Sequence, residues 1–207
     1  MSDTGSNTDQ AGLAIRSLDA SNANFDAELS ELIAWESVSD GNVAKAVAEI
    51  IADVRARGDE AVAEYTQKFD GAAVVDVDRT QMAAAKARIS PEVLSALSFS
   101  ADRIRAYHQR QLQDSWTYTE ADGTVLGQKV TPMDRVGLYV PGGKAAYPSS
   151  VLMTAIPAKV AGVGELIIAS PSPKGELNDL VLAAADIAGA DRLVTIGGAQ
   201  AVAAMAY

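Results

Sequence analysis

The sequence contains no cysteine and only one histidine, His108, among its 207 residues. The absence of cysteine excludes disulfide bonds and thiolate metal ligands. A zinc site built from this chain alone would need carboxylates or glutamine for nearly all of its ligands, which is uncommon. The sequence therefore predicts no metal-binding residue of its own.

Long hydrophobic runs and basic clusters are also scarce. No stretch reaches the ~18 uninterrupted apolar residues that a membrane-spanning helix needs. The polar N-terminus, MSDTGSNTDQAG, has neither the basic nor the apolar part of a signal peptide. The formal net charge is −10, which argues against binding to a phosphate backbone. We therefore expect a cytoplasmic protein that binds neither nucleic acid nor membranes.

Hydrophobic residues make up 48% of the chain but aromatic residues only 5%, and alanine is frequent. This profile suits alanine-rich helices packed on a sheet. Residues 1–20 are rich in Ser, Thr, Asn, Asp and Gly, which predicts a flexible N-terminal arm.

Residues 21–133 are predicted to form a helical region with one β-hairpin, as part of a first domain. Apolar residues at helical spacing predict helices over residues 24–35, 42–57, 59–70, 79–88 and 90–111. In the second of these, one face carries Val43, Val47, Ile50, Ile51 and Val54. Asp59 is a candidate cap for the third helix, and Ser90 followed by Pro91 begins the last. Alternating residues around Asp122 and Gly123 predict the hairpin, in which we expect Trp116 and Tyr118 to pack.

Residues 134–207 repeat a different pattern, a short apolar strand followed by a helix. Strands are predicted over 136–140, 165–169 and 192–196, and helices follow each of them, the first capped by Ser149 or Ser150. Buried parallel strands have this composition, and repeated strand–helix units imply a doubly wound sheet. The predicted class is therefore α/β, with an incomplete Rossmann-like parallel sheet. Because doubly wound sheets have more than three strands, we expect a truncated chain.

Two glycine-containing loops follow predicted strands. The first, around Gly142 and Gly143, departs from the phosphate-binding pattern G-x-x-x-x-G-K-[ST] in spacing and in its last residue. Gly162 and Gly164 likewise fail the dinucleotide pattern and are better explained as the end of a helix. What remains is general: loops at the carboxyl ends of parallel strands are where open α/β sheets bind ligands. The second loop, which carries Gln200, has the same position, although either loop alone could be an ordinary turn.

His108 lies on a predicted helix, where it could orient a substrate or could simply be solvated. The acidic residues are spread along the sequence. They form no close carboxylate pair of the kind that glycosidases use.

Several motifs, in order and spacing, resemble the histidinol dehydrogenase family. The strongest are RVGLYVPGG (135–143), AAYPSSVLM (145–153), IPAKVAG (156–162) and IGGAQA (196–201). The segments RGDEA (57–61), YTQKFD (65–70) and YHQRQ (107–111) are similar to the N-terminal region of that family. The resemblance extends from about residue 14 to the end of the chain.

The resemblance implies oxidation of L-histidinol to L-histidine through L-histidinaldehyde, the last step of histidine biosynthesis, by a homodimer that uses NAD and zinc. Tyr139 and Gln200 match family positions that contact the cofactor, and residues 134–207 would be the NAD-binding region. Family members are roughly twice as long, and their zinc ligands and proton-handling Glu-His pair lie in the part not represented here. The resemblance thus implies no catalytic residue in this chain and an inactive fragment. Alternatives are a relative that oxidises another small alcohol or a sulfonated diol, or a non-catalytic α/β remnant.

Overall fold

The computed structural model describes residues 17–33, 41–142 and 146–207. The chain forms two compact units, residues 1–45 and 46–207. In the first unit, α1 (Phe25–Ile33) confirms the predicted helix, whose last two residues, like residues 1–16 of the predicted arm, lie outside the described ranges. The domain boundary expected near Asp134 stays a prediction.

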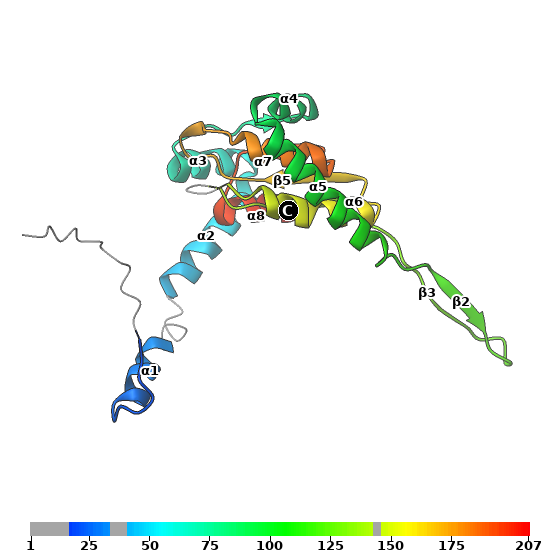
Figure 1. Cartoon of the computed structure of the whole chain (residues 1–207), viewed down its shortest axis with the longest axis horizontal. Coiled ribbons are helices and arrows are strands. Elements are labelled where there is room, and N and C mark those ends of the chain that lie inside the picture. Colours follow the sequence, from blue (N-terminus) through cyan, green and yellow to red (C-terminus); the bar gives the residue numbers. More distant parts are fainter. Residues whose placement is uncertain (1–16, 34–40, 143–145) are drawn as a thin grey trace, which may run out of the picture. The chain divides into compact units, whose positions relative to one another are not determined.

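The second unit is an α/β structure (Figure 1). Its helices are most of α2 (Gly41–Arg57), then α3 (Asp59–Asp70), α4 (Arg79–Ala85), α5 (Pro91–Gln109), α6 (Pro148–Val160), α7 (Asp179–Ala188) and α8 (Gly198–Ala206). Two short 3-10 turns are η2 (Lys86–Arg88) and η3 (Pro173–Gly175). The strands are β1 (Asp76–Val77), β2 (Trp116–Thr119), β3 (Val125–Gln128), β4 (Arg135–Tyr139), β5 (Glu165–Ala169) and β6 (Arg192–Val194). None of these helices is both long enough and apolar enough to cross a bilayer.

The central sheet has the strand order β1-β6-β5-β4. β4, β5 and β6 are parallel, with Leu138 opposite Ile168 and Ile168 opposite Leu193. This confirms the predicted Rossmann-like parallel sheet. The antiparallel strand β1, which pairs with β6 at the edge, was not predicted. With only two residues, β1 is too short to show the alternation by which a strand is recognised.

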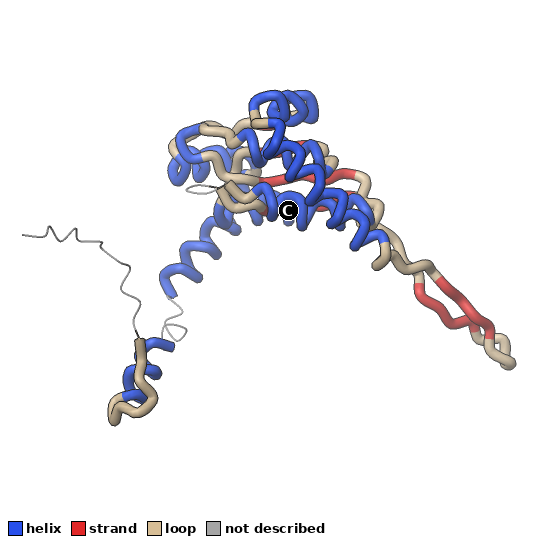
Figure 2. The backbone as a smooth tube through the Cα atoms, viewed as in Figure 1, coloured by secondary structure: helices blue, strands red, loops and turns tan. Residues whose placement is uncertain are grey.

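Helices cover both faces of the sheet, so that its strands lie between helical layers (Figure 2). Leu166, Ile168 and Leu193 face one layer, where they pack with residues of α4, α5, α6 and α7. Ala169 and Ile196 belong to the opposite side, where the core is completed by α2, α3 and α8. Alternate strand residues point to opposite faces, so both faces are apolar and the strands are nearly continuous hydrophobic runs.

Two predicted helix starts are wrong. Gly58, and not Asp59, precedes α3, because a single residue separates this helix from α2 and Asp59 already lies in its first turn. Its charge there still favours the helix dipole. α6 begins at Pro148, before Ser149 and Ser150, and makes no side-chain cap hydrogen bond. Proline suits the first helical position because no N–H is needed there.

Other helix signals hold. Ser90 accepts a hydrogen bond from the Val93 N–H at the start of α5, as predicted, although the helix ends at Gln109 instead of 111. α4 begins with a capping box between Asp78 and Gln81 that the sequence interpretation missed. Gly162 has a positive φ after α6, which confirms its assignment to a helix end.

The apolar face predicted for α2 is only partly used. Val54 is buried and Ile50 and Ile51 pack against the core, but Val43 and Val47 are exposed. Within the second unit, the helix therefore packs on the core through its C-terminal half.

The predicted hairpin is present and extends away from the body of this unit (Figure 1). Every residue of both strands is exposed. Trp116 and Tyr118 stack on each other, with 6.1 Å between ring centroids, so the expected packing occurs within the hairpin itself.

An ion cluster lies at the amino end of β5. Asp191 pairs with Arg79 and with Lys159, and its carboxylate also accepts the Leu166 N–H at 2.8 Å. Burial alone would raise the pKa of Asp191, but hydrogen bonds from the two cations and from the backbone outweigh it, so the pKa lies below its ordinary value. The cluster joins α4, α6, β5 and the turn before β6.

We expect Asp191→Asn to lower the free energy of unfolding by about 2 kcal/mol at pH 7, because an amide cannot replace the charged acceptor. The depressed pKa means that the wild-type advantage is complete above the unfolded-state pKa of about 3.9 and disappears as the pH falls through the lower folded-state value. Urea unfolding at pH 7, 5 and 3 measures this. Asp102→Asn, which breaks an exposed pair with Arg105, is the control. An equal loss at pH 7 and pH 3 would contradict the assignment.

Candidate functional site

The carboxyl ends of β4, β5 and β6 meet at one edge of the sheet, as parallel strands require. The loops that follow them converge on Pro171. A Cβ added to Gly142 would collide with the carbonyl oxygen of Pro171, and one added to Gly197 would lie 2.6 Å from its ring. The two glycine loops of the sequence analysis are therefore held together by a proline between them.

Tyr139 is the last residue of β4 and is 41% exposed. It points to the same face as Gly137, because residues two apart in a strand share a face. A Cβ on Gly137 would lie 2.6 Å from Met205 Sδ of α8. The Tyr139 ring thus lies at the carboxyl edge of the sheet, on the face that α8 covers.

Gln200 lies in the first turn of α8, the helix that begins at the same edge. Its side chain is 1% exposed, and Oε1 is buried with no hydrogen-bond partner in the described part of the chain. Buried polar atoms nearly always have a partner, so an orphaned acceptor needs an explanation. A role of this amide oxygen in accepting a hydrogen bond from a ligand is such an explanation.

The helices of this unit change from one face of the sheet to the other after β6. α6 and α7 lie on one face of the sheet, whereas α8 lies on the other and reaches back to β4. A change of face is how a doubly wound sheet reverses its strand order, and open α/β sheets bind ligands in the crevice beside that point. Tyr139 and Gln200 flank this region.

One titratable group behaves unusually near this edge. Asp70 ends α3, which contacts η3 in the loop after β5. Burial raises the pKa of Asp70, and its Oδ2 has no hydrogen-bond partner within the described ranges. No cation among the described residues offsets this effect of burial.

His108 lies away from this edge. It is near the end of α5, whose last turns line a small cavity with Lys159 and Val160 at the end of α6, toward the amino ends of the strands. His108 Nδ1 is 2.6 Å from Gln111 Oε1, and the ring contacts Tyr107 edge-on. These surroundings make His108 a surface residue that is not part of the candidate site.

Metal ligands are not assembled in the described residues: no group of three or more His, Cys, Asp or Glu side chains could hold an ion there. Zinc therefore does not fit the residues that this structure places. Gly143, which belongs to the predicted loop, lies outside the described residues.

The sequence interpretation missed Pro171 and the rest of the loop after β5. Ser170, Pro171, Ser172 and Lys174 line a cavity at the same edge. A signal was present, because the run Ser-Pro-Ser-Pro directly follows an apolar strand.

Comparison with known proteins agrees with this architecture. The family model for histidinol dehydrogenase matches residues 34–207. Curated histidinol dehydrogenases from Pseudomonas savastanoi pv. phaseolicola and Nitrosospira multiformis are 61% and 54% identical over 199 and 200 residues. Each alignment covers 94% of this chain but only 44% and 46% of the relative, so the chain spans less than half the length of these proteins.

A solved structure of histidinol dehydrogenase from Elizabethkingia anophelis superimposes with a TM-score of 0.73 at 30% sequence identity. The match covers 79% of this chain and 38% of that one. The family model covers most of the chain, and the fold agrees with it. The chain belongs to the histidinol dehydrogenase family.

Proposed function

We propose that this chain provides the NAD-binding α/β part of an enzyme that oxidises L-histidinol to L-histidine through L-histidinaldehyde. Family membership supports the reaction, and the buried, unpartnered Oε1 of Gln200 at the carboxyl edge of the sheet supports a cofactor site. The cofactor would accept the hydride that the alcohol and then the aldehyde release. The chain's own residues would bind and orient it.

Tyr139 and Gln200 are the proposed cofactor contacts. The half-exposed Tyr139 ring can pack against an adenine or a ribose, because aromatic rings supply rigid apolar area with a polar end. The Gln200 carboxamide can accept a hydrogen bond from a ribose hydroxyl or an adenine amino group. Because Gly142 and Gly197 have no side chain, the backbone at both positions can approach Pro171 closely. The edge of the sheet therefore carries no side chain at these two points.

Zinc binding and proton transfer would belong to residues outside this chain. The described residues hold no zinc ligand set, and His108 lies at the other end of the strands. We further propose that the whole enzyme is a cytoplasmic homodimer.

The purified chain is expected to bind NAD+ and to show no histidinol oxidation, with or without zinc. Tyr139→Ala should weaken NAD+ binding about tenfold, equivalent to about 1.4 kcal/mol, through loss of the ring contact. Isothermal titration calorimetry measures the affinity, and absorbance of NADH measures turnover. Tyr118→Ala, which removes a comparably exposed ring from the hairpin, should change nothing. Turnover by the chain alone, or equal affinities for both variants, would refute the assignment.

A further inference from the structure

A second cavity, of about 330 Å³, lies toward the amino ends of the strands, at the other end of the sheet from the candidate site. Three helices that pack on one another end there: α5 at Gln109, α6 at Val160 and α7 at Ala188. The volume is at the lower end of the range of about 300–1,000 Å³ that small-molecule sites occupy. A ligand that fills this cavity therefore has to be small.

The floor of this cavity is apolar. Ile156 is 1% exposed and Ala188 is 4% exposed, and Val160 and Leu112 complete the apolar lining. These side chains suit a compact apolar group, such as a single ring or a branched chain, because the removal of apolar surface from water is favourable.

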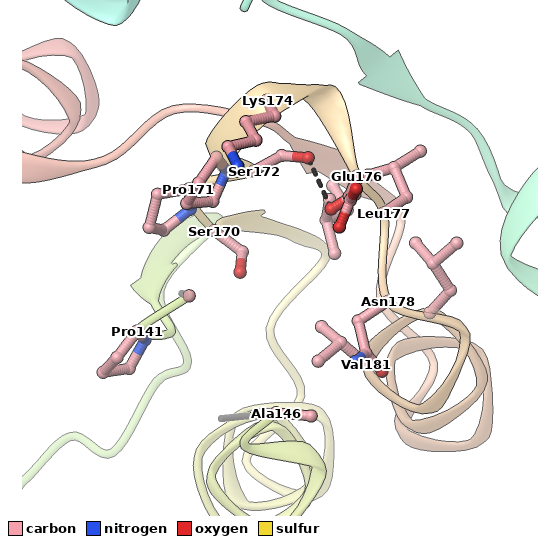
Figure 3. Close-up of a pocket in the computed structure, with 14 residues that line it drawn as sticks. Pro141, Ala146, Ser170, Pro171, Ser172, Lys174, Glu176, Leu177, Asn178 and Val181 are labelled. Atoms are coloured by element: carbon pink, nitrogen blue, oxygen red, sulfur yellow. Dashed lines mark hydrogen bonds between the residues drawn. The ribbon is translucent and has the colours of Figure 1, made fainter. Parts of the chain in front are cut away.

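The polar part of the lining consists of Arg105, Lys159 and Gln109, so two cations and no carboxylate of the described residues line the cavity. This sign of charge is unusual for the chain, which has 27 acidic residues and only 17 basic ones. The cavity at the carboxyl edge of the sheet, by contrast, has both Lys174 and Glu176 in its lining (Figure 3). The second cavity therefore favours an anion over a zwitterion or a cation.

The two cations are only partly neutralised by their partners. Lys159 shares the carboxylate of Asp191 with Arg79, so one negative charge there faces two positive charges. In the described part of the chain, Arg105 pairs only with Asp102, which lies three residues earlier on α5 and is largely exposed. An exposed pair of this kind is weak, because water screens it. The cavity thus keeps a net positive charge.

We propose that this cavity binds a small organic acid, that is, a compact apolar group with one carboxylate or phosphate group. The apolar part would lie on Ile156 and Ala188. The acid group would accept hydrogen bonds from Arg105 and Lys159, with the Gln109 amide as a further donor. An amino acid fits less well, because none of the described carboxylates lines the cavity to receive its ammonium group. The site is separate from the proposed cofactor edge and does not depend on NAD binding.

Benzoate and phenyl phosphate are suitable probes, and amide chemical-shift mapping of the 207-residue chain locates and measures their binding. We expect at least one of them to shift the amides of residues 105–112, 156–160 and 188–189. It should bind at least about tenfold more tightly than benzamide, which lacks the charge, and than acetate or inorganic phosphate, which lack the ring. Equal affinity for the probe and for either kind of control compound would overturn the proposal.

Four substitutions test the contribution of charge. Arg105→Gln removes a cation from the cavity and should weaken binding of the better probe about tenfold. Arg103→Gln removes a cation of the same helix that lies over the Phe99 ring, and it should leave the affinity unchanged. Gln109→Glu brings a carboxylate to the two cations and should abolish binding. Gln67→Glu, near the end of α3, adds the same charge elsewhere and should have no effect.

Thermal unfolding separates a binding role of the cations from a structural one, in which they only offset the negative carboxyl ends of the three helices. Neither Arg105 nor Gln109 is buried, so both variants should unfold at nearly the wild-type temperature. If Arg105→Gln lowers the melting temperature but leaves the probe affinity unchanged, or if no probe shifts these amides, the role is structural and the proposal is wrong. If a probe binds equally to the Arg103→Gln and Arg105→Gln chains, it occupies another site, which also overturns the proposal.

Discussion

Replacing Gln200 with methionine is expected to stabilise the chain and to weaken NAD+ binding. The substitution keeps the length of the side chain but removes a buried acceptor that has no partner in the described residues. An unsatisfied buried polar atom costs about 1–3 kcal/mol, so the free energy of unfolding should rise by about 1 kcal/mol. Loss of the amide's hydrogen bonds to the cofactor should raise the Kd about 10- to 100-fold. Thermal unfolding and calorimetry measure the two effects.

The opposite signs of these effects distinguish a binding residue from a structural one. If Gln200 stabilises the fold, the substitution should lower the free energy of unfolding of the chain. If Gln200 serves to bind a ligand, the substitution should raise it. Gln67→Met, an exposed position on α3, provides the control and should change neither quantity. A less stable Gln200→Met chain with unchanged NAD+ affinity would remove Gln200 from the site.

Gly142→Ala is expected to disrupt the candidate site more than any other small substitution in it. The new Cβ would collide with the backbone carbonyl of Pro171, and backbone cannot rotate away as a side chain can. Overpacking of this kind costs about 1–3 kcal/mol, so the free energy of unfolding should fall by that amount. Because the loop after β4 must move, NAD+ affinity should fall at least about tenfold.

A matched substitution separates the collision from the general effect of adding a methyl group. Gly41 begins α2, has no positive φ, and a Cβ there would meet no atom within 4 Å. Gly41→Ala should therefore be neutral or slightly stabilising, since alanine favours helices by up to about 1 kcal/mol. Equal behaviour of the two variants would show that the close approach of Gly142 to Pro171 does not hold the site together. Unfolding in urea and NAD+ titration cover both variants.

The strand–helix pattern of residues 135–207 could be predicted because each strand is a short, continuous apolar run. A run such as Glu165–Ala169 is buried on both faces and is bounded by glycine or proline. The order of the strands follows from chirality and short connections. By contrast, β1 depends on its pairing with β6, more than 100 residues away, and two residues carry no local signal.

The candidate site, like the fold, could be predicted only in part. Tyr139 and Gln200 were assigned from the family resemblance, and the topology of parallel sheets explains why the two loops that follow β4 and β6 lie at one edge. Their contact with a cofactor stays a prediction. Pro171 was not found, because the Ser-Pro-Ser-Pro run indicates only a loop, whereas the contact of Pro171 with Gly142 and Gly197 depends on tertiary structure. The positive φ of Lys174 was also beyond prediction, because glycine is the residue that such a conformation favours.

The helix faces show the same limit. Hydrophobic spacing identified α2 correctly, yet only its C-terminal half packs, and Val43 and Val47 remain exposed. Spacing shows which residues share a face but not what that face meets. Which residues of a predicted apolar face stay exposed can be learned only from the tertiary structure.

The central claim is that NAD+ binds at the carboxyl edge of β4, β5 and β6, and amide chemical-shift mapping of the chain on addition of NAD+ tests it most directly. The account predicts shifts in residues 139–142, 170–174 and 196–200, with smaller changes elsewhere. Shifts centred on Arg105 and Lys159, at the amino ends of the strands, or no shifts at saturating NAD+, would contradict it.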